Sequence, residues 1–301
     1  MILPPTFVNN VIAAFGNPGR CYLDDLEDLL FEAAHRWDLT IGKPFQLSYN
    51  YVCAVIRADG TPAVLKLGVP NRELTSEINA LNVYAGQGAC HLLEAEADKG
   101  MLLLERLQPG TMLSTLGDDD RATEIAAQVM KAIHRPLPEE NGFRSLRGWF
   151  VELTNLRPRF GGGTGPFPEK TIETVKGIIR ELFAEHQPHV LLHGDFHHFN
   201  ILKSDRGWLV IDPKGVDGPP EYEVGPLLLN PWGDMLDEKE AIQRTNRRIT
   251  ILSEQLGFDR QRLWMWAVSY SLLSAWWDLT DDGSGGEYAL TWTEILLKMV
   301  N

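Results

Sequence analysis

Short apolar runs interrupted by turn signals dominate residues 44–108 and predict a β-rich region with one helix. The stretch 44–68 reads P-F-Q-L-S-Y-N-Y-V-C-A-V-I-R, then A-D-G-T-P, then A-V-L-K-L-G, which is typical of a β-hairpin. Apolar residues at helical spacing predict a helix over 72–84. The run M-L-L-L-E-R-L predicts a further strand, which the breaker Pro109-Gly110 ends.

The rest of the chain has mainly helical periodicity. Apolar residues spaced by four predict a helix over 121–135, and the stretch 263–279, too short and too polar for a membrane span, predicts a buried helix. Residues 159–168 read R-F-G-G-G-T-G-P-F-P and predict a flexible loop; no lysine follows the last glycine, so this is not a Walker A loop. Residues 1–43, with the acidic run D-D-L-E-D-L-L-F-E-A-A-H-R-W, predict an N-terminal helical extension.

One polar loop carries the strongest chemical signal of the chain. The run H-G-D-F-H-H-F-N-I-L, which begins at His193, places Asp195 and Asn200 in one loop after three apolar residues. Two short apolar runs around the turn S-D-R-G then predict a hairpin that returns Asp212 beside Asn200. A carboxylate that can orient or deprotonate a hydroxyl would then stand beside an amide and a second carboxylate, which suit nucleotide-bound Mg²⁺. Phosphoryl transfer needs this arrangement, because its loose transition state depends on positioning and charge neutralisation.

The same residues resemble known phosphotransferases. The spacing of Asp195 and Asn200 is similar to that of the protein-kinase catalytic loop, but a glycine replaces its arginine and Pro213 follows Asp212 where those enzymes have Phe-Gly. The H-G-D and I-D-P forms, together with G-P-P-E-Y-E-V-G further on, instead resemble the aminoglycoside phosphotransferase family, in its streptomycin 6-phosphotransferase and hydroxyurea kinase branch. The resemblance extends from about Pro44 to the tryptophan-rich C-terminal region.

The resemblance implies an α+β, two-lobed, protein-kinase-like fold that binds ATP in the cleft between its lobes. Asp195 would be the base or orienter of the acceptor hydroxyl, and Asn200 and Asp212 would be the Mg²⁺ ligands. Together with the sequence pattern, it predicts three segments: an N-terminal helical extension at residues 1–43, a small antiparallel β-sheet lobe at 44–108, and a larger, mainly helical lobe with the catalytic loop and acceptor site at 109–301.

A lysine of the predicted hairpin extends the resemblance to the nucleotide phosphates. Lys66, in A-V-L-K, resembles the kinase lysine that reaches the α- and β-phosphates and is held by a carboxylate on a helix. Glu77 is the candidate partner on the following helix, and Glu73, one turn earlier, is the alternative.

The remaining nucleotide contacts depart from the protein-kinase pattern. Residues 47–51 contain no glycine, so a glycine-rich phosphate loop is missing, and Ser48 and Asn50 are the candidate phosphate donors. The backbone of Glu105 and Leu107, just before the breaker, resembles the hinge that hydrogen-bonds adenine.

Two different interpretations compete with a kinase. A zinc site would use His193, His197 and His198, but no cysteine or well-spaced carboxylate set accompanies them. We expect His193 to brace the loop and the other two to line it. A non-catalytic nucleotide-binding pseudokinase is the second alternative, and the presence of Lys66 and of all three polar residues of the loop region argues against it.

Charge and acidic residues bear on the partner. The chain has 301 residues, 44% hydrophobic and 23% charged, and its net charge of −13 argues against a nucleic-acid partner but is compatible with a cationic ligand. Carboxylates near the acceptor would suit a polyamine or a guanidino sugar. The candidate substrate contacts are Asp217, Glu221, Glu223 and Asp278. Other acidic residues of the C-terminal half are expected on the solvated surface: Asp234, Asp237, Asp281 and Asp282.

Cysteine usage and the N-terminus favour a cytoplasmic location. Cys21, Cys53 and Cys90 stand far apart without C-x-x-C spacing, which predicts no disulfide framework. The N-terminal residues M-I-L-P-P-T-F-V-N-N lack the basic start and continuous apolar run of a signal peptide. No membrane partner is expected, and the oligomeric state stays open.

The expected reaction is transfer of the γ-phosphoryl group of ATP to a hydroxyl of a small molecule. No A-P-E-like segment follows Asp212, which favours a small acceptor over a protein. The expected acceptor class is an aminoglycoside such as streptomycin. Hydroxyurea, or an ordinary metabolite such as an amino alcohol or a sugar, is the alternative.

Overall fold

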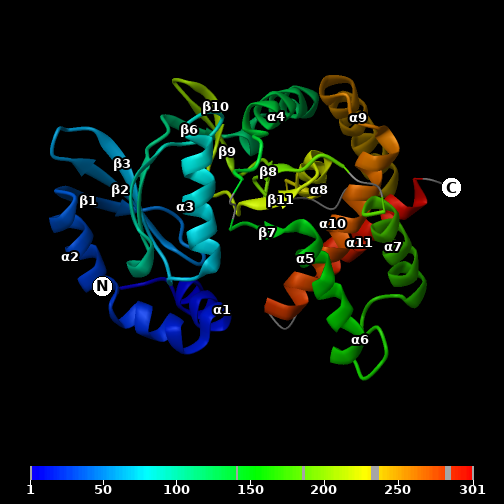
Figure 1. Ribbon diagram of the computed structural model, residues 1–301, viewed down its shortest axis with the longest axis horizontal. Coiled ribbons are helices and arrows are strands. Elements are labelled where there is room, and N and C mark those ends of the chain that lie inside the picture. The colour runs from blue at the N-terminus through cyan, green and yellow to red at the C-terminus, as the bar shows by residue number, and fades with distance from the viewer. Residues whose placement is uncertain (1, 140–141, 185–186, 232–236, 282–285, 300–301) are drawn as a thin grey trace. The chain divides into compact units, whose positions relative to one another are not determined.

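The chain divides into two compact units, Met1–Gly110 (unit 1) and Thr111–Asn301 (unit 2). The computed structural model describes residues 2–139, 142–184, 187–231, 237–281 and 286–299 (Figure 1). Each unit has its own sheets, helices and buried apolar residues, so the two are described in turn.

Unit 1 is built on a five-stranded antiparallel sheet of order β1-β2-β3-β5-β4 (Figure 1). β2 and β3 pair from Tyr51 opposite Leu67 to Ile56 opposite Pro62, which confirms the predicted hairpin. Tyr51 and the alternate residues after it in β2 are buried, as a strand with one face on a core requires. The strands are β1 Leu39–Pro44, β2 Tyr51–Arg57, β3 Pro62–Leu67, β4 Leu92–Glu96 and β5 Met101–Glu105, with a short 3₁₀ turn at Ala97–Lys99 before β5.

The predicted helix after the hairpin is α3, Arg72–Tyr84. It begins where the side chain of Asn71 accepts the backbone N–H of Leu74 at 2.9 Å, which satisfies one of the donors that the first turn leaves open. It ends at Ala85, which takes the left-handed conformation at φ 47°. The apolar face of α3 is buried, and Glu77 is buried with it.

Two N-terminal helices, α1 (Pro5–Asp24) and α2 (Leu26–Arg36), belong to the core of unit 1. The Tyr22 hydroxyl donates to the carbonyl of Leu67 at 2.8 Å and accepts the N–H of Tyr51 at 3.2 Å, so it joins the ends of β2 and β3. Their apolar side chains share one cluster with the strands: Phe7, Val11, Tyr22, Leu26 and Ala33.

The prediction that residues 1–43 are helical is wrong at its C-terminal end. β1 begins at Leu39 and pairs with β2, with Leu39 opposite Arg57 and Thr40 opposite Ile56. The alternating run L-T-I has the period of a strand, and the free edge of β2 gives its backbone groups partners.

Unit 2 is mainly helical and contains two small sheets, of order β10-β9-β6 and β7-β11-β8 (Figure 1). Its long central helix α10, Arg260–Asp281, packs against α7, α8, α9 and α11, which confirms the predicted buried helix. Within the described part of the chain, no helix is long and apolar enough to cross a membrane. The helices are α4 Asp119–Ile133, α5 Leu146–Val151, α6 Leu156–Arg159, α7 Glu169–Leu182, α8 Val224–Leu229, α9 Glu238–Leu256, α10 and α11 Glu287–Lys298. The strands are β6 Pro109–Met112, whose first two residues belong to unit 1, β7 Arg144–Ser145, β8 Val190–Leu192, β9 Ile201–Ser204, β10 Gly207–Val210 and β11 Val216–Gly218.

A buried ion pair ties α4 to α9. Arg248 is 2% exposed, and its Nε lies 3.0 and 3.1 Å from the two carboxylate oxygens of Asp119, while its Nη1 donates to the carbonyl of Asn230 at 2.7 Å. The neighbouring Arg247 is 53% exposed and pairs with Asp120 at 3.1 Å on the surface. The chain thus offers two adjacent arginines in opposite environments.

Replacing Arg248 with methionine should lower the free energy of unfolding by about 2–3 kcal/mol, because a buried carbonyl loses its donor and Asp119 keeps only the longer contact with Arg247, at 3.8 Å. Replacing Arg247 with methionine should change it by less than about 1 kcal/mol, because exposed pairs contribute little. Urea denaturation followed by tryptophan fluorescence measures both values. Equal losses in the two variants would contradict the role given to the buried pair.

Candidate active site

The catalytic loop predicted from the sequence lies between β8 and the β9–β10 hairpin. In that hairpin Ile201 pairs with Val210 and Ser204 with Gly207. The N–H of Ile211 then donates to the carbonyl of Asn200 at 3.0 Å, so the chain returns Asp212 beside Asn200. The predicted hairpin and the return that it was expected to produce are confirmed.

Asp195 and Asn200 are held together within the loop. The amide nitrogen of Asn200 lies 3.0 Å from the carbonyl of Asp195 and 3.3 Å from its carboxylate oxygen Oδ2. With this nitrogen committed to Asp195, the amide oxygen is the atom that could ligate a cation. The Asp195 side chain is 28% exposed, so it can be reached by a substrate.

His193 braces this loop, as the sequence predicted. Its Nε2 bonds to the carbonyl of Ile211 at 2.8 Å, and its Nδ1 accepts the N–H of Asp195 at 3.2 Å. Burial lowers the pKa of His193 to about 4, so the ring is neutral at pH 7 and can make both bonds. Because both nitrogens are used by the backbone, His193 is a poor candidate for the alternative zinc site.

Glu223, expected among the substrate contacts, has a different role. It is fully buried, and its carboxylate accepts the backbone N–H groups of His193 and Gly194. Burial raises the pKa of Glu223 to about 8, although these two N–H groups act in the opposite direction. A carboxylate without exposed surface cannot meet a substrate, so Glu223 is a support of the catalytic loop.

Gly194 and Asp212 are among the residues of this region with a positive φ. Gly194 has φ 85°, and a Cβ there would come within 2.9–3.1 Å of Val216, Lys214 and Trp149, so only glycine fits. Asp212 has φ 60°, a region in which Asp is tolerated better than most residues. The close approach at Gly194 explains why the motif reads H-G-D.

In unit 1, Lys66 and Glu77 form a buried ion pair. The Lys66 Nζ lies 2.8 and 2.7 Å from the two carboxylate oxygens of Glu77, and the residues are 6% and 5% exposed. The partner of Lys66 is thus Glu77, the residue that the sequence favoured over Glu73. A strand lysine held by a helix carboxylate is the arrangement that positions a cation for nucleotide phosphates.

The other expected nucleotide contacts have less defined surroundings. Glu105 closes β5, and its N–H donates to the carbonyl of His91 at 2.9 Å, so this N–H is already used within the sheet. Ser48 and Asn50 lie in the bend between β1 and β2, where the Asn50 side-chain oxygen packs closely against Gly68. Their roles toward a nucleotide stay predictions.

The acidic residues expected near the acceptor have separate environments. Asp217, on β11, pairs with His189 at 2.5 Å, and the buried Glu221 pairs with Arg262 at 3.1 Å. Asp278, on α10, is partly exposed. Asp234 and Asp282 lie outside the described residues, Asp237 caps α9, and Asp281 ends α10.

Besides Glu223, Asp278 is an acidic candidate that acts on the same residue as Asp195. Burial raises the pKa of the Tyr270 phenol, and the carboxylates of Asp195 and Asp278 act in the same direction.

Sequence reasoning missed Lys214 and an aromatic wall. Burial alone would raise the pKa of Asp195, but His197 and then Lys214 hold it well below its usual range. Trp149 packs against Gly194, and its ring lies 5.3 Å from that of Trp277 in an edge-to-face contact. The position of Lys214 two residues after Asp212 was a usable signal, whereas nothing local indicated that the two tryptophans meet.

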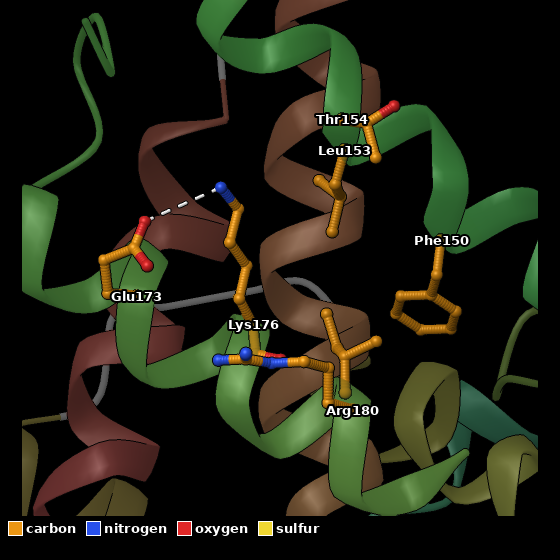
Figure 2. A pocket seen from close by; sticks show the side chains of 7 residues that line it. Phe150, Leu153, Thr154, Glu173, Lys176 and Arg180 are labelled. Atoms are coloured by element: carbon orange, nitrogen blue, oxygen red, sulfur yellow. Dashed lines mark hydrogen bonds and ion pairs between the residues drawn. The ribbon is translucent and has the colours of Figure 1, made fainter. Parts of the chain in front are cut away.

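A separate hollow of about 320 Å³ lies between α5, the following 3₁₀ turn Glu152–Asn155, and α7 (Figure 2). Lys176 points toward Glu173, at 3.6 Å, across one side of it (Figure 2). None of the expected site residues lines it. Its lining residues are Phe150, Leu153, Thr154, Glu173, Lys176, Ile179 and Arg180.

The fold of the chain is that of the protein-kinase-like small-molecule kinases. Choline kinase LicA from Streptococcus pneumoniae superimposes with a TM-score of 0.67 at 14% identity, covering 91% of this chain and 98% of that one. The aminoglycoside phosphotransferase APH(4)-Ia, in a ternary complex with ADP and hygromycin B, gives 0.63 at 16% identity, covering 91% of this chain and 98% of that one. The predicted α+β class is confirmed.

Sequence comparison narrows the class to one family. Residues 36–283 match the family described as aminoglycoside/hydroxyurea antibiotic resistance kinase, and the chain belongs to it. A streptomycin 6-kinase of Streptomyces glaucescens is 31% identical over 94% of this chain and 92% of its own length. A hydroxyurea phosphotransferase of Kitasatospora aureofaciens is 31% identical over 99% of this chain and 85% of its own length. The protein is thus a phosphotransferase that acts on a hydroxyl group of a small molecule.

Replacing Glu77 with glutamine should reduce kcat/KM for ATP by about 10- to 100-fold, because a buried charge-assisted hydrogen bond contributes roughly 1.5–3 kcal/mol. Glu73→Gln, an exposed change on the same helix, should stay within about twofold of the parent. Steady-state kinetics with varied ATP measures both. Equal behaviour of the two variants would show that the ion pair does not position Lys66 for the nucleotide.

Proposed function

We propose that the protein transfers the γ-phosphoryl group of ATP to a hydroxyl of a cationic, polyhydroxylated small molecule of the aminoglycoside class. The observation that carries the proposal is the loop that holds Asp195 against Asn200 and returns Asp212 beside them. The family and the similarity to a streptomycin 6-kinase support it.

Asp195 is the residue that acts on the acceptor. Its carboxylate is exposed enough to accept a hydrogen bond from a hydroxyl, and His197 and Lys214 keep it ionised. An ionised carboxylate orients the hydroxyl and can take its proton as the oxygen attacks phosphorus. The protein then contributes mainly position, since the transition state needs little covalent chemistry.

Asn200 and Asp212 are the residues that would hold Mg²⁺ on the nucleotide. An amide oxygen and a carboxylate are hard oxygen donors, and magnesium is usually bound by one or two such groups together with substrate phosphates. The donor set therefore fits the metal. When bound, Mg²⁺ would neutralise charge on the β- and γ-phosphates.

Lys66, in unit 1, is the residue that we assign to the nucleotide phosphates. Lys66 lies on a strand of the sheet, and Glu77 on α3 fixes its ammonium group, so little conformational entropy is lost when a phosphate binds. Ser48, Asn50 and the backbone of Glu105 and Leu107 are the further contacts that we assign to the nucleotide.

The acceptor class follows from acidic and aromatic groups around the loop. Asp278 and Trp277 are partly exposed neighbours on α10, and Trp277 packs on Trp149, which lies against Gly194. Carboxylates and aromatic faces both attract cationic groups. Hydroxyurea is the second candidate, because the hydroxyurea phosphotransferase matches this chain with the same identity.

Incubation with ATP and a panel of streptomycin, hydroxyurea and neutral alcohols and sugars tests the acceptor. We expect mass spectrometry to find a singly phosphorylated streptomycin, and Asp195→Asn to lower its formation by about 10²–10⁴-fold. Phosphorylation of a neutral alcohol alone would refute the cationic acceptor but keep the kinase. Unchanged turnover in Asp195→Asn would remove this residue from the mechanism.

Asp212→Asn should raise the Mg²⁺ concentration for half-maximal turnover by at least about tenfold, because a charged oxygen ligand is lost. Asp205→Asn is the matched control, since Asp205 is exposed in the turn of the same hairpin and should leave the metal dependence unchanged. Magnesium titrations at saturating ATP measure both. The assignment fails if both variants follow the parent curve.

A further inference from the structure

His197 contacts the carboxylate that the proposed reaction depends on. Its Nε2 lies 3.3 Å from Oδ1 of Asp195, and the two side chains are 16% and 28% exposed. On the other side of the same carboxylate, the amide nitrogen of Asn200 lies 3.3 Å from Oδ2. The two oxygens of Asp195 are thus approached by two different side chains.

The tautomer of His197 follows from its second contact. The backbone N–H of Phe199 donates to Nδ1 of His197 at 3.3 Å, so Nδ1 must carry a lone pair. The proton of the neutral ring is therefore on Nε2, the atom that faces Asp195. The ring is also held by an edge-to-face contact with Phe199 at 5.7 Å.

A third distance fits this arrangement. Nε2 of His197 and the amide nitrogen of Asn200 are 3.4 Å apart, and both are donors, so they do not bond to each other. They meet because both are directed at the same carboxylate. One donor alone would let the carboxylate turn about its bond to Cβ, whereas donors to both oxygens fix the plane of the group.

We propose that His197 is a positioning residue, whose Nε2–H fixes the plane of the Asp195 carboxylate so that it meets the acceptor hydroxyl in one orientation. The proposal rests on the proposed function of Asp195. Because misplacement of a reacting group affects the chemical step, loss of this bond should lower kcat and leave both Michaelis constants near the parent values.

Two amide variants with different reach test the bond. The amide nitrogen of glutamine can occupy the place of Nε2, whereas that of asparagine reaches only the place of Nδ1. We expect His197→Gln to retain kcat within about threefold, and His197→Asn to lose on the order of 10- to 100-fold with unchanged Michaelis constants. Equal losses in both variants, or a change confined to the Michaelis constants, would overturn the proposal.

The same pair in an Asp195→Asn background separates this proposal from the proposed function. If His197 acts through Asp195, the difference between the two amide variants should disappear there. A difference that persists would mean that His197 acts elsewhere. High turnover in Asp195→Asn itself would refute the role of Asp195, and with it the basis of this proposal. The single variants His197→Gln and His197→Asn test only the role of His197.

A measurement on the unaltered protein tests the proposal even if the variants fail to fold. Nitrogen-15 NMR of the histidine side chains, with His197 assigned by its loss in His197→Gln or by sequential connectivity, reports the tautomer directly. We expect a protonated Nε2 and an unprotonated Nδ1 in the neutral ring. A proton on Nδ1 would remove the donor and end the proposal, whatever the acceptor turns out to be.

Discussion

Everything in the site depends on one buried network that fixes the backbone just before Asp195. The Glu223 carboxylate receives two successive backbone N–H groups, and the ring of His193 joins the loop to Ile211, the residue that precedes Asp212. The N–H of Lys214 returns to the carbonyl of His193 at 2.6 Å. Hydrogen bonds in a water-poor interior strengthen one another and are costly to leave unmade, so this region has one well-defined arrangement.

The same network determines which of its side chains are charged. His193 stays neutral because burial makes its charged form unfavourable, and for the same reason the pKa of Glu223 is raised. Asp195, by contrast, is kept ionised by the groups beside it. Carboxylates only a short distance apart therefore have opposite tendencies, and the one that stays charged is the one that a substrate can reach. Burial pushes both acids toward the neutral form, and the groups beside Asp195, His197 and Lys214, are what separate the reactive acid from the supporting one.

Local patterns predicted most of what carries the chemistry. The β9–β10 hairpin follows from turn residues and alternating apolar runs, which act over a few residues, whereas the Lys66–Glu77 pair was expected from the resemblance to kinases. The role of Glu223 and the meeting of Trp149 with Trp277 depend on segments far apart in the chain, so no local signal could reveal them. In the G-P-P-E-Y-E-V-G run, two glutamates look alike, yet one pairs with an arginine and the other with the backbone.

Tyr22 makes the first helix part of the hydrogen-bonded core of unit 1. Its hydroxyl serves two backbone groups at the ends of β2 and β3, next to Lys66. A fragment that started at β1 would leave that carbonyl and that N–H without their partner and would uncover the apolar side of the sheet that α1 and α2 occupy. Protein engineering that fuses or trims this chain should therefore treat the first helix as part of the unit that bears the lysine, and place any junction before it.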